Sequence, residues 1–383
     1  MTTTLSSNTA EEASYAWAEH LIWMEGGEPI SAAEKESVWP GLITIVALAG
    51  VALTCGWLVS QAGWAQARLL DPIVVSMILG LLVGNLVGGA HWLPGVSVAV
   101  RWFLPLGILL LGARMDFFEA LRIGVPGLGL SVGVVAMSLL LLLWIGKILG
   151  LDRKMAILLG VGTGICGGTA IVALAPLIRA REKDVFVAVG LVTLIGLGMM
   201  LFLPFLVRSF ALTEVQSGLL AGLVIHQTPQ AIASGFAIGE SAGEVATVAK
   251  LSRVCLLVPM ALFLGWWISR GEEEGKSVKR SWLRLIPWFA VGFFLVALAR
   301  TIGLFPEVAL EWEAAGIEFE SADLLKSISV FCLAVGMVAV GFQTRFSQAR
   351  SVGFRPFLSA FCGSLIITVV AVAVIWSFFP FEI

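Results

Sequence analysis

Eleven long apolar segments follow one another along the chain and leave little sequence for anything else. An α-helix needs about 20 apolar residues to cross a bilayer, and 58% of this chain is hydrophobic while only 13% is charged. The mean hydropathy of +0.97 lies outside the range of soluble domains. The sequence therefore predicts an all-α polytopic membrane protein with about 10–11 transmembrane helices, at roughly 41–60, 72–90, 99–115, 125–149, 155–178, 185–207, 216–237, 244–268, 283–305, 323–344 and 356–379.

The chain divides into a polar, acidic tail at residues 1–40 and a transmembrane transporter domain at 41–383. The tail lacks the basic start and cleavage site of a signal peptide. We predict an ordered tail, with a short amphipathic helix on the membrane surface as the alternative. A net charge of −2 gives no basic surface for nucleic acid. Five scattered cysteines indicate neither a disulfide framework nor a metal site, and we expect no cofactor.

The Lys and Arg residues between the segments constrain the orientation, because positive loops favour the cytoplasmic side. Eleven simple crossings cannot place all the clusters on one side. We therefore expect one segment between 185 and 268 not to cross as a plain helix, and 216–237 is the candidate because it contains "HQTPQ". An uninformative charge bias is the alternative. The clusters are at Arg114 and Arg122, at Arg179, Arg181 and Lys183, at Arg270 through Arg284, and at Arg345, Arg350 and Arg355.

Two pairs of segments resemble each other within the chain. "LGILLLGARMDFFEA" (106–120) resembles "VGMVAVGFQTRFSQA" (335–349), and "ILLGVGTGICGGTAIVA" resembles "GLLAGLVIHQTPQAIAS". Inverted repeats with interrupted helices are typical of secondary transporters, whose sites lie near the bilayer midplane. Similarity by Gly, Ala and Leu composition alone is the other interpretation.

The stretch "GVGTGICGGTAIVALAP" (161–177) concentrates glycine inside an apolar segment. Gly160, Gly164 and Gly168 are spaced by four, which suits close helix packing in membranes. Packing does not explain Gly162 and Gly167, because each glycine costs about 1 kcal/mol relative to Ala inside a helix. A local unwinding explains all five, and it would offer backbone N–H groups to an anion. We therefore predict a broken helix here, with candidate ligands Thr163, Gly164, Cys166, Gly167, Gly168 and Thr169.

A second interruption and a pair of cations complete the candidate site. In "VIHQTPQAIASG" (224–235), Pro229 disrupts a turn beside four polar side chains. In the following segment two cations three residues apart share a helix face, with snorkelling as the alternative. The interior of no predicted segment carries Asp or Glu, which favours an anionic solute over a cation. The candidates added here are His226, Gln227, Thr228, Gln230, Lys250 and Arg253, and His226 could couple a proton to transport.

Four motifs, "GTGICGGTAIVALAPLIRA", "HQTPQAIASG", "VAKLSRVCLLVP" and "VGMVAVGFQT", resemble the YeiH-like sulfate exporter family in order and spacing over residues 41 to 380. The resemblance implies a multi-pass transporter of the bacterial inner membrane, distantly related to bile-acid symporters and cation/proton antiporters. It also implies crossed interrupted helices that hold the solute, and one domain moving against another as in an elevator. Family members with "SSICGAAA" and "HEVAQV" carry an acidic residue where this chain has Gln227, and Ala at the places of Gly168 and Thr169.

Together these observations predict a secondary active transporter of a small inorganic anion, of sulfate or sulfite type, working in export. The alternatives are a sodium-coupled symporter of a small anion such as bicarbonate or a sulfonate, and an anion channel. An enzyme is not expected, since no nucleophile–base pair is visible. The expected partners are the anion, a coupling ion (H⁺ or Na⁺) and the lipid bilayer; the sequence leaves a homo-oligomer open.

Overall fold

The computed structural model describes residues 37–61, 71–87, 89–269, 287–304, 309–312, 317–344, 346 and 353–378. The predicted tail at 1–40 therefore lies almost wholly outside the described residues. Each of the eleven predicted apolar segments contains helix, and the two described strands form one small antiparallel pair, β1 (Ala309–Trp312) and β2 (Ile317–Glu320). The predicted all-α class is confirmed. By length and composition, seven described helices can cross a membrane, and Pro72–Val87 and Trp288–Thr301 are shorter apolar helices.

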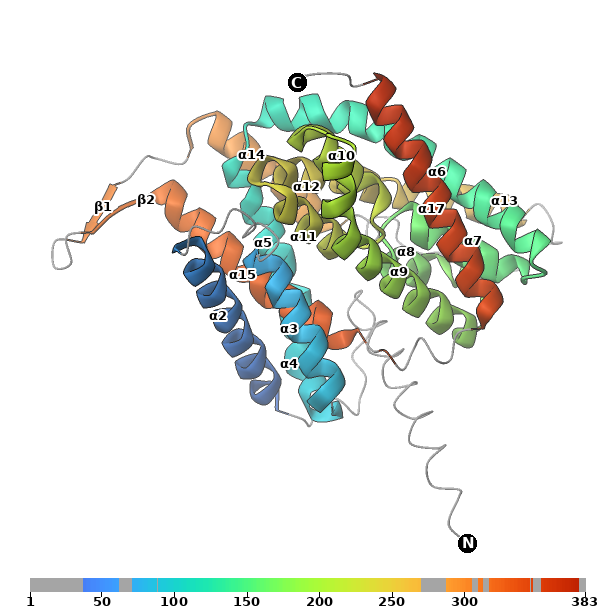
Figure 1. The fold of residues 1–383 in the computed structure, drawn as a ribbon, viewed down its shortest axis with the longest axis horizontal. Coiled ribbons are helices and arrows are strands. Elements are labelled where there is room, and N and C mark those ends of the chain that lie inside the picture. Colours follow the sequence, from blue (N-terminus) through green and yellow to red (C-terminus); the bar gives the residue numbers. More distant parts are fainter. Residues whose placement is uncertain are drawn as a thin grey trace, which may run out of the picture.

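The helices form two groups, and in Figure 1 α2, α3, α4 and α15 of the first lie at the lower left while α7, α13 and α17 of the second lie at the right. In the first group, the α3–α15 bundle, α15 packs against α2, α3 and α5, and α14 packs against α5. Its elements are α2 (Trp39–Gln61), α3 (Pro72–Val87), η3 (Ala90–Trp92), α4 (Leu93–Val98), η4 (Ala99–Phe103), α5 (Leu104–Leu111), η5 (Gly112–Arg114), α14 (Trp288–Thr301) and α15 (Ser321–Gln343).

In the second group, the hairpin bundle, α6 packs against α7, α12 and α17, while α12 packs against α10 and α11. The two bundles also meet, because α3 contacts α11 and α14 contacts α6. The elements of the hairpin bundle are α6 (Phe117–Ile148), α7 (Arg153–Gly164), α8 (Gly168–Leu174), α9 (Glu182–Ser209), α10 (Glu214–Val224), α11 (Thr228–Ile238), α12 (Glu240–Val254), α13 (Leu257–Ser269) and α17 (Phe354–Phe378).

The first broken element, α7–α8, is a hairpin that returns to the face from which it starts. Lys154 Nζ donates to the carbonyl of Arg179 at 2.7 Å, and Asp152 lies 3.9 Å from Arg181. These residues stand just before or at the start of α7 and just after α8, so the two ends of the element are together. Neither half, with 12 and 7 residues, is long enough to span a bilayer at about 1.5 Å per residue.

The second broken element, α10–α11, is also a hairpin and starts from the opposite face. Thr213 and Gln216 form a capping box that begins α10. A Cβ on Gly239, after α11, would touch the carboxylate of Glu214, so both ends of this element also meet. Since α9 runs from the first hairpin to the second, the hairpins enter the bundle from opposite faces and point toward each other.

The topology prediction was therefore half right. Residues 216–237 do not cross as a plain helix, as expected, but residues 155–178 do not cross either. As a consequence, Arg114 lies on the face of Glu240, at the start of α12, while Arg179 and Arg181 lie on the other face. The expectation that all the basic clusters share one side is wrong, because two elements fail to cross instead of one.

The internal repeats appear as reciprocal contacts. A Cβ on Gly107 of α5 would lie 2.8 Å from Leu333 Cγ, and a Cβ on Gly336 of α15 would lie 2.6 Å from Leu104 Cβ. Gly107 and Gly336 occupy equivalent places in the two similar segments. Gly107 allows the close approach of Leu333, which stands three positions before Gly336, and Gly336 allows that of Leu104, which stands three positions before Gly107. The long helices α6 and α17 are related in the same way. α6 packs on the first half of one hairpin, α7, and on the helix after the other hairpin, α12, while α17 packs on α10 and α9.

The hairpin topology predicts which sites an impermeant maleimide reaches. With the exposed Cys55 and Cys255 replaced by Ser, single cysteines at Asp152 and Arg181 should label from the same side of sealed vesicles. Phe210→Cys and Ser241→Cys should label from the opposite side. Labelling of Asp152→Cys and Arg181→Cys from opposite sides would mean that residues 153–174 cross.

Candidate functional site

The tips of the two hairpins meet inside the hairpin bundle. The first tip, Ile165 to Gly167, interrupts the chain between α7 and α8, and the second, Ile225 to Gln227, interrupts it between α10 and α11. A Cβ on Gly167 would lie 2.7 Å from Gln227 Cγ. Both predicted interruptions are therefore present, and the structure brings them into contact.

Local sequence explains each break. Gly167 has φ +77°, a left-handed conformation that glycine adopts without the steric cost of a Cβ. At the second tip the backbone of Ile225 and Gln227 is extended, and Pro229 stands in the first turn of α11. Proline suits that turn, because the first N–H groups of a helix have no partner within the helix.

Lys250 of α12 holds both tips. Its side chain is fully buried, and its Nζ donates to the carbonyls of Ile165 at 3.1 Å, Ile225 at 2.6 Å and His226 at 2.7 Å. The three donors of an ammonium group thus match three backbone oxygens from the two breaks. This lysine does not snorkel to the surface.

Arg253, also fully buried, does the same for the last turns of α7 and α10. Its guanidinium donates to the carbonyls of Thr163, Gly164, Gly222, Leu223 and Ile225. The last four carbonyls of a helix lack partners within the helix, and they carry its negative partial charge. Arg253 therefore caps two half-helices at once.

The cation pair has no carboxylate partner among the described residues. The negative ends of α7 and α10 and the positive starts of α8 and α11 carry about half a charge each, so the four ends roughly cancel. With both side chains protonated, the centre of the bundle carries a surplus of about two positive charges. An uncompensated charge is costly in a low-dielectric interior.

The other predicted residues lie around the two cations, and three of them contact α17 or α9. His226 Nε2 pairs with Ser364 Oγ of α17 at 2.9 Å, and Gln227 and Gln230 both donate to Thr193 of α9. Thr228 and Cys166 are buried, Gly168 is half-buried and Thr169 is exposed. Among the predicted site residues, three buried side-chain atoms find no partner within the described part of the chain, namely Thr163 Oγ1, His226 Nδ1 and Gln230 Oε1.

Sequence reasoning missed three residues that position the tips: Thr193, Ser364 and Ser138 of α6. Ser138 donates to the carbonyl of Gly160 in α7. Thr193 and Ser364 each donate to the carbonyl four residues earlier in their own helix, as Ser and Thr commonly do in helices. That habit makes a single hydroxyl in an apolar segment uninformative, so the sequence carried no signal for these three.

The fold and the comparisons now define the class of protein, and it is a multi-pass membrane protein. A family model described as "Conserved hypothetical protein 698" matches residues 40–360. A UPF0324 membrane protein of Bordetella bronchiseptica is 33% identical over 291 residues, which cover 74% of this chain and 87% of the relative. One of Pseudomonas aeruginosa is 31% identical over 345 residues, covering 88% and 92%, and one of Bacillus cereus is 27% identical over 312 residues, covering 81% and 85%.

The chain belongs to the UPF0324 family of membrane proteins. The resemblance to the YeiH-like family is thereby confirmed.

The capping role of the cations predicts a stability effect. Arg253→Gln would leave several buried carbonyls without donors, and each unsatisfied buried group costs about 1–3 kcal/mol. We expect the free energy of unfolding in detergent to fall by about 2–4 kcal/mol, and that of Lys250→Met to fall similarly. Lys147→Gln, at an exposed end of α6, should change it by less than about 0.5 kcal/mol. Equal effects at the exposed and buried positions would contradict the capping role.

Two neighbouring glycines offer a matched comparison at the first tip. Gly167→Ala combines a positive φ with a 2.7 Å approach to Gln227 Cγ, whereas a Cβ on Gly168 meets only Val189, at 3.3 Å. We expect Gly167→Ala to destabilise the protein by at least about 1–2 kcal/mol and Gly168→Ala to cost less. Thermal unfolding of both variants measures the difference, and a larger loss for Gly168→Ala would refute this geometry.

Proposed function

We propose that this protein is a secondary active transporter of a small inorganic anion of the sulfate or sulfite type, with a bound anion at the meeting point of the two hairpin tips. The observation that carries the proposal is the buried pair of Lys250 and Arg253, which no described carboxylate neutralises. A divalent anion beside the tips would match the surplus of about two positive charges.

The arrangement of backbone favours the same class of solute. Non-helical backbone at membrane depth is tolerated where protein covers it or where it lines a cavity, and here two such breaks face each other. The first turns of α8 and α11 hold backbone N–H groups next to the tips. Gly168, Thr169 and Gln227, which stand at these turns, are not fully buried.

The contacts of Lys250 argue against sodium at the same carbonyls. A bound Na⁺ would need the carbonyl oxygens of the breaks as ligands, yet Lys250 Nζ already bonds those of Ile165, Ile225 and His226. We therefore rank proton coupling or plain anion exchange before a sodium-coupled symporter. His226, whose ring lies between the second tip and Ser364, is the proposed carrier of a coupling proton.

For the mechanism we propose that the hairpin bundle moves as a unit against the α3–α15 bundle, as in an elevator. Both hairpins and both cations belong to one bundle, so the tips need not separate during such a movement. We also propose that the protein resides in the inner membrane and exports its solute. The face of Arg179 and Arg181, from which the first hairpin starts, would be cytoplasmic under the positive-inside rule.

The test of the function is sulfate counterflow. Protein reconstituted in liposomes that are preloaded with unlabelled sulfate should take up labelled sulfate faster than protein in empty liposomes. Sulfite, thiosulfate, bicarbonate and a small sulfonate, added in turn, should compete in an order that gives the solute class. Uptake that does not respond to internal sulfate would indicate a channel, and absence of binding or uptake for every anion would refute the proposal.

The charge argument makes a separate prediction. Lys250→Met removes one unit charge from the site, and the Coulomb energy lost scales with the charge of the anion. At an effective dielectric constant of about 20, two unit charges about 4 Å apart interact by about 4 kcal/mol, and the energy falls with distance and doubles for a divalent anion. We therefore expect the Kd of a divalent anion to rise by about tenfold or more. The Kd of a monovalent anion should rise by a clearly smaller factor, and Lys250→Arg should affect both less. An equal rise in Kd for the divalent and the monovalent anion would show that the charge of Lys250 does not contribute to anion binding.

A further inference from the structure

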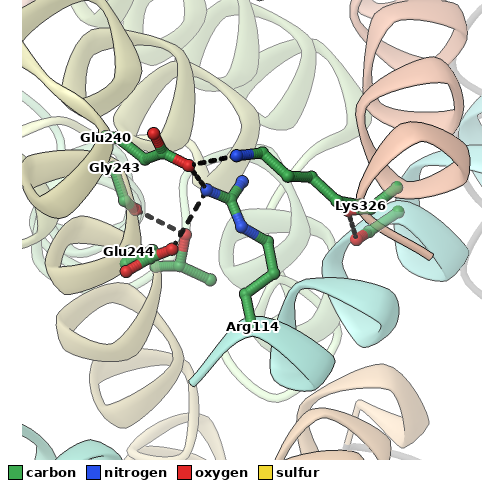
Figure 2. A network of polar contacts seen from close by, with 8 residues as sticks. Arg114, Glu240, Gly243, Glu244 and Lys326 are labelled. Carbon is green, nitrogen blue, oxygen red and sulfur yellow. Dashed lines mark hydrogen bonds and ion pairs between the residues drawn. The ribbon is translucent and has the colours of Figure 1, made fainter. Parts of the chain in front are cut away.

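Four charged side chains join the two bundles at the face from which the second hairpin starts. Arg114 pairs with Glu240 and lies 3.2 Å from Glu244 Oε1, while Lys326 Nζ lies 2.8 Å from Glu240 Oε1. Figure 2 shows one carboxylate oxygen of Glu240 joined by dashed lines to the guanidinium of Arg114 and to the ammonium of Lys326. We call these four residues the ionic cluster.

The two signs of charge come from different bundles. Arg114 ends η5 and Lys326 belongs to α15, so both cations stand on the α3–α15 bundle. Glu240 and Glu244 stand in the first two turns of α12, the helix that further along carries Lys250 and Arg253. Arg114 also lies over the ring of Phe236 in α11, 5.8 Å from its centroid. The cluster therefore ties the helix that holds both hairpin tips to the other bundle.

Burial differs across the cluster and indicates which contact matters most. The side chain of Arg114 is 9% exposed and that of Glu244 is 23% exposed, whereas Glu240 and Lys326 are 60% and 46% exposed. Exposed ion pairs are weakened by water and salt, and shielded ones are weakened less. The contacts of Arg114 with α12 should thus supply most of the attraction, and the Lys326 contact should be the part most sensitive to salt.

The chain also passes from one bundle to the other beside the cluster. Only Met115 and Asp116 separate η5 from α6. Asp116 caps α6 by accepting from the N–H groups of Phe118 and Glu119, and it accepts from Thr301 Oγ1 of α14 at 3.0 Å. The bond from the Glu119 N–H is the main cause that lowers the pKa of Asp116. This short, capped connection keeps Arg114 close to the first turn of α6, beside the face where α12 begins.

We propose that Arg114, Glu240, Glu244 and Lys326 form an ionic latch that stabilises the arrangement of the two bundles seen here and opens when the hairpin bundle moves. The proposal rests on the movement put forward under the proposed function, and it adds the contact that sets the balance between its states. Opening would transfer the two carboxylates of α12 away from both cations at once.

Distances between spin labels on the two bundles test the latch. Labels at Leu58→Cys of α2 and Leu140→Cys of α6, both exposed positions, report the relative placement of the bundles in nanodiscs, with Cys55 and Cys255 replaced by Ser. In the otherwise unchanged protein one distance should dominate. The double variant Glu240→Gln, Glu244→Gln should raise the ratio of a second distance to the first by about five- to tenfold.

Two controls make the result specific. Glu182→Gln removes one carboxylate charge, as the single variant Glu244→Gln does, from the exposed first turn of α9 on the opposite face, and it should leave the distances unchanged. Raising the salt concentration from about 50 mM to about 500 mM shortens the Debye length, so it should shift the protein with its natural latch residues in the same direction as the double variant. The salt experiment and the single variant Glu244→Gln carry the test if the double variant does not fold.

The outcomes separate the latch from the transport function, because the distance measurement needs no solute. Unchanged distances in the double variant and in high salt, together with intact sulfate counterflow, would overturn the latch and leave the transporter proposal standing. A second distance that responds to the latch variants, in a protein that neither binds nor transports sulfate, would support the latch and overturn the choice of solute.

Discussion

The hydrogen bonds from two buried cations to the ends of two half-helices are the interaction on which the rest of this structure depends. A helix that stops inside a membrane protein exposes carbonyls that no water can satisfy, and two such helices, α7 and α10, stop within contact of each other. Lys250 and Arg253 satisfy these carbonyls from a single helix face. Without them, the glycine-rich and proline-containing breaks would leave unpaired polar groups at both tips, so the breaks and the cations require each other.

Burying two cations that only carbonyl groups contact costs free energy, and this cost is the basis of the proposal that the site binds an anion. Carbonyl oxygens carry only partial charge, so they satisfy the hydrogen-bond donors of the cations without neutralising them. A chain that needed only to cap two helix ends could have used neutral donors, such as the Gln side chains that bond Thr193. Two full charges in their place leave the centre of the hairpin bundle suited to an anion. The helices that follow the two hairpins, α9 and α12, differ in this respect. Thr193 of α9 bonds the second tip with neutral groups, whereas α12 contributes both cations.

The sequence predicted the positions of the helices and of the two interruptions well, since long apolar runs and clusters of glycine or proline are local signals. It could not distinguish a re-entrant hairpin from a broken crossing helix. The two halves of residues 153–174 together hold as many apolar residues as one crossing, and hydrophobic periodicity is the same in both cases. The contacts of Lys154 with Arg179 and of Asp152 with Arg181, residues 25 and 29 positions apart in the chain, reveal the return, and such contacts have no local signature.

The candidate site shows the same division between local and distant information. Lys250 and Arg253 could be identified because cations in an apolar segment are rare and their spacing places them on one face. Their partners could not, since the carbonyls of Thr163 and Ile165 lie 90 and 85 positions earlier in the chain. The charge pattern alone therefore fitted direct contact with an anion, whereas the geometry directs the hydrogen bonds of both cations to the backbone. Any effect of these cations on an anion must then act through the field they create and through the shape of the tips they hold, and a change in either cation would alter both.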